Sequence, residues 1–89
     1  MRVDYENVCE KLMRECRKVE DEKFIAEAYE LLKGLSEDEL MDKCDLCIGE
    51  AIRAKSVIWL CGEYLKSAGE DKKSYREDLI KAANDFFDY

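Results

Sequence analysis

The five cysteines are the side chains whose chemistry is easiest to name. Cys44 and Cys47 form a C-x-x-C motif, which can supply two thiolate ligands to a metal ion. Zinc takes four ligands, and Cys9 and Cys16 lie on the apolar stripe of an expected N-terminal helix. A four-thiolate site across a helical bundle is therefore one interpretation. The helical spacing of Cys44 and Cys47 favours the alternative, in which these thiols pack as small apolar side chains.

Two pairs of carboxylates could also bind a metal ion. Glu27 and Glu30 form an E-x-x-E pair, and Glu39 and Asp42 form an E-x-x-D pair. This spacing resembles the acidic pairs that hold Mg²⁺ in all-α nucleotide pyrophosphohydrolases, because carboxylate oxygens are hard ligands. However, 22 acidic residues in 89 produce such spacings by chance. Three of the four lie off the expected apolar stripes, which favours a solvated surface over a magnesium site.

Other catalytic chemistry lacks the residues it requires. The chain contains no histidine, so it has neither a Ser-His nor a Cys-His nucleophile and no histidine metal ligand. It also lacks a glycine-rich phosphate loop. The basic residues of the N-terminal segment alternate with acids, which is typical of a salt-bridged surface rather than of a nucleic-acid site. We therefore expect no catalytic residues, no cofactor and no direct binding of nucleic acid.

Negative charge is concentrated in the middle of the chain. The net charge is −7, and residues 20–52 alone carry −8. Such a segment repels nucleic acid and anionic membranes and attracts basic partners. The residues that we expect to face a basic protein are Glu37, Asp38, Asp42 and Asp45.

The sequence predicts a cytoplasmic protein with reduced thiols. Its N-terminal segment alternates charged and apolar residues, unlike a signal peptide, and its longest apolar run, Val57–Cys61, is too short to cross a membrane. An odd number of cysteines cannot all pair within one chain. The absence of Gln and Thr beside many Glu and Lys is consistent with a thermophilic source, whereas the Cys and Met content argues against one.

Apolar residues recur with helical spacing along the whole chain, which predicts an all-α fold. The stripe of the first segment changes register near residues 20–23, through either a bent helix or a short turn with Asp21 as N-cap. Gly34 is placed as a helix C-terminal residue, and Ser36 and Glu39 form an S-x-x-E capping box. A turn at residues 34–36 is therefore the firmest boundary in the sequence.

These boundaries predict a small antiparallel helical bundle of three to four helices. Two long helical arms, 4–33 and 37–68, form a hairpin, and a short C-terminal helix, 74–88, packs back on it. The second capping box, Ser74-x-x-Glu77, marks the start of that last helix. A chain of this length forms one domain, 1–89.

The segment around Trp59 is apolar on all sides. Ile58 and Trp59 fit the inward stripe, whereas Val57, Leu60 and Tyr64 point to the opposite side. A helix that is apolar all round must be covered all round. Either the C-terminal helix wraps over Val57, Leu60 and Tyr64, or a second protein does, and a twofold homodimer is then the default.

The leading functional hypothesis is a non-enzymatic protein-interaction module that self-associates through Val57, Leu60 and Tyr64 and presents its acidic surface to a basic partner. One alternative is a small acidic inhibitor that imitates nucleic acid, because carboxylates at helical spacing can imitate phosphates. The other is an enzyme that resembles the Mg²⁺-dependent all-α nucleotide pyrophosphohydrolases.

Overall fold

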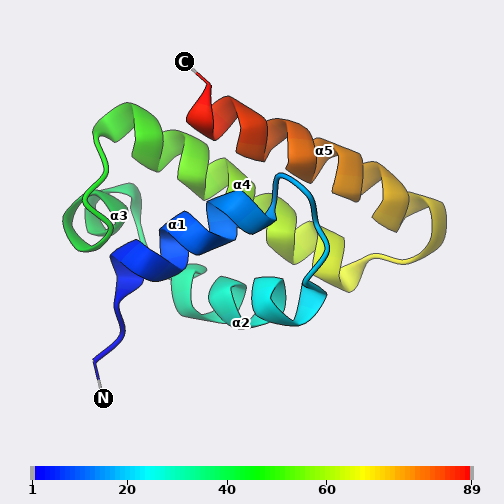
Figure 1. Ribbon diagram of the computed structural model, residues 1–89, viewed down its shortest axis with the longest axis horizontal. Coiled ribbons are helices and arrows are strands. Elements are labelled where there is room, and N and C mark those ends of the chain that lie inside the picture. Colours follow the sequence, from blue (N-terminus) through cyan, green and yellow to red (C-terminus); the bar gives the residue numbers. More distant parts are fainter. Residues whose placement is uncertain (1, 89) are drawn as a thin grey trace.

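The computed structural model describes residues 2–88, which form five α-helices and no strands (Figure 1). The helices are α1 (Tyr5–Glu15), α2 (Glu22–Leu32), α3 (Glu37–Lys43), α4 (Ile48–Lys66) and α5 (Gly69–Phe87). The prediction of an all-α fold is confirmed. Within the described residues, no helix combines the length and the hydropathy that crossing a membrane requires.

Side-chain caps explain where the first three helices begin. Asp4 and Asp21 accept hydrogen bonds from backbone N–H groups in the first turns of α1 and α2. The predicted capping box is present at α3, where Ser36 accepts from the backbone of Glu39 and the Glu39 carboxylate accepts from the backbone of Ser36. Each cap satisfies amide groups that have no partner inside the helix.

The predicted arm 4–33 is two helices joined by a short link. Glu15 closes α1 by accepting hydrogen bonds from the backbone N–H groups of Glu20 and Asp21, each at 2.6 Å. Val19 lies in the left-handed region with a φ of 50°, which turns the chain between the two helices. The alternative of a short turn with Asp21 as N-cap is therefore correct, and the continuous helix is not.

The predicted single helix 37–68 is wrong, because the chain breaks between α3 and α4. Asp45 has a φ of 55°, and the carboxylate of Glu50 accepts a 3.0 Å hydrogen bond from the backbone of Cys47. That hydrogen bond lowers the pKa of Glu50 and caps the N-terminus of α4. The C-x-x-E pattern is a capping box whose first residue is a cysteine.

The C-terminal helix begins earlier than predicted. The structure starts α5 at Gly69, whose φ of 62° suits glycine, and the second capping-box pattern, Ser74-x-x-Glu77, lies inside the helix. The long antiparallel hairpin is therefore α4 with α5, not 4–33 with 37–68, and the residues that the structure describes form five helices rather than three or four (Figure 1).

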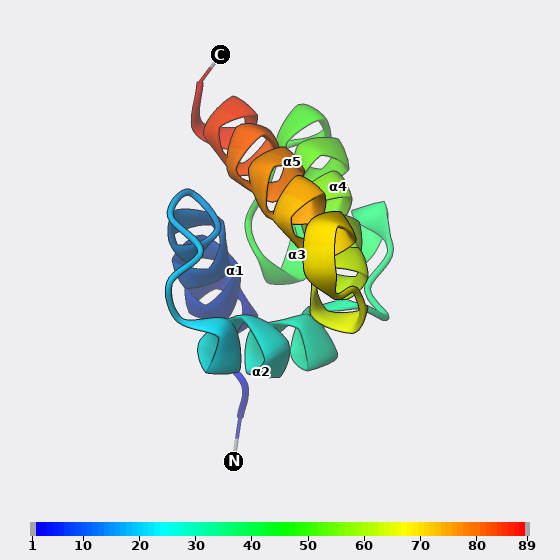
Figure 2. The ribbon, with the colours of Figure 1, turned by 90° about the vertical axis from the view of Figure 1, so that its right-hand side faces the viewer.

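The helices surround one core, with α1 and the α4–α5 hairpin on opposite sides and α2 across one end (Figure 2). Every fully or nearly fully buried residue is apolar. The largest fully buried side chains are Leu12, Met13, Ile25, Leu32, Leu40 and Leu79, followed by Val57 and three cysteines. Leucine, isoleucine and thiol groups therefore provide most of the apolar burial that stabilises the fold.

At Gly62 a side chain of α2 packs directly against the backbone of α4. A Cβ atom on Gly62 would lie 2.6 Å from the hydroxyl oxygen of Tyr29 and 2.8 Å from its Cζ atom. The aromatic ring of Tyr29 therefore occupies the space that any larger residue at position 62 would need. Glycine is required here for packing, since its backbone is ordinary helix.

We predict that Gly62→Ala destabilises the protein by about 1–3 kcal/mol, because the added methyl group overpacks the contact with Tyr29. In a Tyr29→Ala background the same change should instead stabilise by about 1 kcal/mol, the helix-propensity gain of alanine over glycine. Urea unfolding of the four proteins measures both values. Equal effects of Gly62→Ala in the two backgrounds would contradict the assigned contact.

Candidate functional site

The surface that the sequence offers as an interface is largely buried within the single chain. Val57 is 0% exposed and Tyr64 is 6% exposed, while Leu60 is partly buried. The Tyr64 hydroxyl donates a 3.2 Å hydrogen bond to Glu22, and burial raises the pKa of Tyr64. Val57 and Tyr64 are therefore part of the core of the single chain, as the wrapping alternative expects, and they cannot contact a partner while this fold is intact.

The exposed apolar surface of α4 lies elsewhere on the helix. Ile48, Ile52 and Trp59 are 54%, 55% and 60% exposed. Their spacing of four and seven residues places them on one stripe of the helix. The prediction that Trp59 points inward is wrong, because the inner face of α4 is formed by Ala51, Ala54 and residues in register with them.

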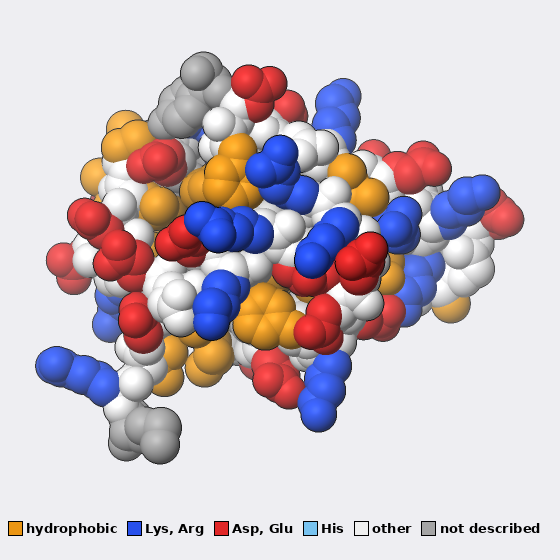
Figure 3. Space-filling model, viewed as in Figure 1, with side chains coloured by type: hydrophobic (Ala, Val, Ile, Leu, Met, Phe, Trp, Pro, Cys, Tyr) orange, Lys and Arg blue, Asp and Glu red, His pale blue; other side chains and the backbone are white. Residues whose placement is uncertain are grey.

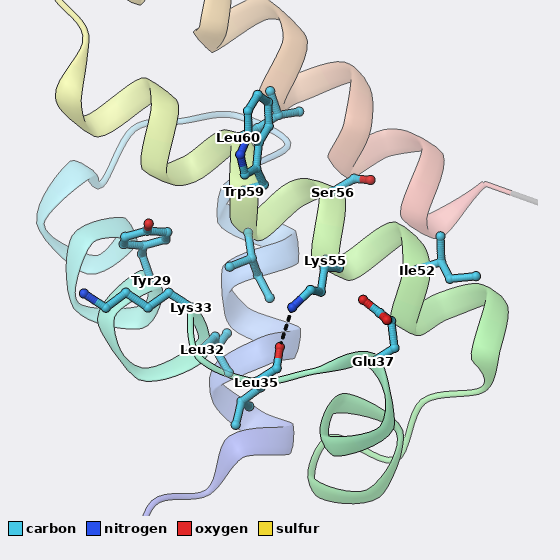
Figure 4. Close-up of a pocket in the computed structure, with 11 residues that line it drawn as sticks. Tyr29, Leu32, Lys33, Leu35, Glu37, Ile52, Lys55, Ser56, Trp59 and Leu60 are labelled. Atoms are coloured by element: carbon cyan, nitrogen blue, oxygen red, sulfur yellow. Dashed lines mark hydrogen bonds between the residues drawn. The ribbon is translucent and has the colours of Figure 1, made fainter.

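An apolar groove of about 610 Å³ lies beside this stripe, between α2 and α4 (Figure 4). Leu32 comes from α2, Leu35 follows α2, and Ile52, Ile58 and Trp59 come from α4. Figure 4 shows α1 behind α4 in this view, so the groove opens on the side of α4 away from α1. Its volume and apolar lining are in the range of natural binding sites.

Charges of both signs border the groove. The Nζ atom of Lys55 donates a 2.8 Å hydrogen bond to the backbone carbonyl of Leu35, which ties α4 to the link before α3 (Figure 4). Lys33 lies 2.9 Å from Glu30 and 5.8 Å from the centroid of the Tyr29 ring, and Glu37 lies on the same rim. By contrast, the face that carries α1 and α5 is dominated by intermixed acidic and basic side chains (Figure 3).

The predicted acidic surface is exposed. Glu37, Asp38 and Asp42 lie on the short helix α3, and Asp45 lies in the link that follows it. All four side chains face solvent. The structure therefore brings three of these carboxylates onto one short helix, with the fourth just beyond its end, where they act as one source of negative potential.

The carboxylates proposed for Mg²⁺ are Glu27, Glu30, Glu39 and Asp42, and each is exposed. Glu30 pairs with Lys33, and Glu39 is used by the capping box of α3. Between residues 2 and 88, no three cysteine, aspartate or glutamate side chains lie close enough to share a metal ion. This holds for both the carboxylate and the thiol candidates.

The C-x-x-C motif is divided between two environments. Cys44 ends α3, is buried, and its Sγ atom donates a 3.5 Å hydrogen bond to the backbone carbonyl of Tyr5. Cys47 is the exposed N-cap residue of α4. Burial, followed by the neighbouring Cys44, raises the pKa of the Cys9 thiol to about 12. The motif is therefore the break between two helices rather than a pair of ligands on one surface.

Comparison with known proteins gives no relative. No protein-family model matches this chain, and neither a curated protein nor a solved structure is significantly similar to it. The surface of the molecule itself is therefore the guide to its function.

The spacing of Ile48, Ile52 and Trp59 places them on one stripe of any helix that contains them, so this part of the signal is present in the sequence. The exposure of that stripe depends on which neighbouring helices cover the other faces of α4.

We predict that a thiol-alkylating reagent modifies the native protein rapidly once, at Cys47, because the other four thiols are buried. Intact-mass spectrometry after brief treatment with N-ethylmaleimide should show a single adduct. The Cys47→Ser variant should show none, and urea should release the remaining four sites. Rapid modification of the Cys47→Ser protein in buffer would contradict the burial of the other thiols.

Proposed function

We propose that this chain is a non-enzymatic protein-interaction module that pairs with a second copy of itself through the exposed stripe of α4. The observation that carries the proposal is the exposure of Ile48, Ile52 and Trp59 beside an apolar groove. Large apolar side chains gathered at such a surface are typical of protein contacts, and tryptophan is prominent among residues that dominate binding energy.

A second copy fits this stripe because the stripe is complementary to itself. In an antiparallel pair of α4 helices related by a twofold axis midway between residues 55 and 56, Ile52 of each copy lies opposite Trp59 of the other. Ser56, an exposed small residue, lies at the crossing point and permits close approach of the two helices. The contact between Ile52 and Trp59 is therefore made twice in the dimer.

Area and charge also support a twofold contact. Ile48, Ile52 and Trp59 expose roughly 350 Å² in each copy, nearly half of the about 800 Å² that a standard interface buries per partner. The walls of the groove supply further area. Because Lys33 and Glu37 both line the groove, each copy presents charges of both signs there, whereas contact between two purely acidic surfaces would be repulsive.

We predict that the purified protein is a dimer at about 100 μM, and that Ile52→Lys and Trp59→Lys are folded monomers, since each change places a charge in the contact. Light scattering after size-exclusion chromatography gives the mass, and circular dichroism confirms folding. Trp59 is the only tryptophan, so its fluorescence should shift to the blue as concentration rises.

Val3→Lys provides a matched control, because Val3 is also exposed but lies outside the helices. It should remain a dimer. A wild-type protein that stays monomeric up to about 1 mM, or a dimer that tolerates both α4 variants, would contradict the proposal.

The acidic surface remains available for a second kind of partner. We propose that Asp38, Asp42 and Asp45 attract a basic protein segment, because they are exposed and belong to the most negative part of the chain. Charge attraction of this kind raises the association rate and weakens with salt, since exposed charges are screened within about 10 Å at 0.1 M.

We predict that a lysine-rich peptide binds the protein at low salt, and that neutralising Asp38, Asp42 and Asp45 to Asn weakens binding by about tenfold. A matched variant neutralises three exposed acids of α5, as Glu70→Gln, Asp71→Asn and Asp78→Asn, with the same change in net charge. It should weaken binding much less. Equal losses would show that net charge alone attracts the peptide, without a role for the surface around α3.

A further inference from the structure

Four of the five cysteines are buried, and they lie in two pairs of neighbours. The Sγ atoms of Cys16 and Cys61 are 3.5 Å apart, although 45 positions separate the two residues in the sequence. Cys9 and Cys44 form the second pair, in which the neighbouring Cys44 contributes, after burial, to the raised pKa of the Cys9 thiol. Packing alone requires only that each thiol fill space, so the pairing of all four is an additional feature of this core.

The Cys16–Cys61 pair brings together the end of α1 and the second half of α4, which are far apart in the sequence. Cys16 is the C-cap residue of α1, and Cys61 lies in the second half of α4. Both are fully buried. A disulfide needs its sulfur atoms about 2.05 Å apart, so closing this pair requires the two sulfur atoms to approach each other by roughly 1.5 Å.

We propose that Cys16 and Cys61 are a redox-modification site and form an intramolecular disulfide when the protein meets a small-molecule disulfide such as oxidised glutathione. One protein thiolate attacks a sulfur of oxidised glutathione, forms a mixed disulfide and releases one glutathione thiolate. The second protein thiolate then attacks the protein sulfur of that mixed disulfide and releases the other glutathione. The two protein thiols lose two electrons, and the two protons end on the two glutathione molecules.

The same burial that preserves the thiols makes the reaction slow. The hydrogen bond with Cys61, followed by burial, raises the pKa of Cys16 far above its usual range, so little reactive thiolate exists in the closed fold. Reaction therefore proceeds when the end of α1 and its link to α2 open locally. Once formed, the bond encloses α2, α3 and most of α4 in one covalent loop, which restricts the unfolded chain.

The test is incubation of the wild-type protein in a glutathione redox buffer, followed by acid quenching, alkylation and peptide mass mapping. The expected product is a peptide pair linked through Cys16 and Cys61 within one chain. The midpoint of thermal unfolding should rise by about 10 °C and return to its original value with dithiothreitol. Exposed Cys47 should form a mixed disulfide with glutathione quickly, which shows that the oxidant is active.

Two variants distinguish the disulfide from simple packing. Cys16→Ala and Cys61→Ala should each abolish the rise in unfolding midpoint caused by oxidation, whatever their effect on the reduced protein. Cys47→Ser should keep it. The proposal is overturned if Cys47 reacts while Cys16 and Cys61 stay reduced, if mapping finds Cys9 linked to Cys44 alone, or if the bonds are only between chains.

Discussion

The small size of the residues on the inner side of α4 is the constraint on which the rest of the structure depends. Ala51, Ala54 and Gly62 are buried, and at Gly62 the side chain of Tyr29 from α2 packs directly on the α4 backbone. Helices α1, α2, α3 and α5 all contact α4. A larger side chain at any of these three positions would separate α4 from a neighbour, and the core of so short a chain has little apolar area in reserve.

The sequence predicts the helical content well because the helix signals are local. Periodic apolar residues, the Asp21 cap and the Ser36–Glu39 capping box act within one or two helical turns, and the structure contains all of them. The break before α4 was missed because its N-cap is a cysteine, which is an uncommon residue in that role, and because neither glycine nor proline interrupts that segment. The predicted start of the last helix at residue 74 is five residues late, because Gly69 is the first residue of α5.

The direction of the side chains on α4 depends on tertiary contacts, and so it could not be read from the same local signals. A helical segment that is apolar on every side has no preferred inward face until its neighbours are placed. Val57 and Tyr64 are buried, whereas Trp59, only two positions beyond Val57, faces solvent. By contrast, the exposure of Glu27, Glu30 and Asp42 was predictable, because charged residues off an apolar stripe remain hydrated at little cost.

Cys61, which faces Cys16 in the core, and Trp59, which lies beside the groove, are on opposite sides of α4. Trp59 and Cys61 are two residues apart, which corresponds to a rotation of about 200° around the helix axis. Cys61 therefore points toward Cys16 at the end of α1, while Trp59 points outward beside the groove. A covalent link at Cys61 restrains the core without placing any new atom on the outward stripe. The proposed disulfide and the proposed contact with a second copy thus involve different faces of one helix, so a substitution can alter either one without the other.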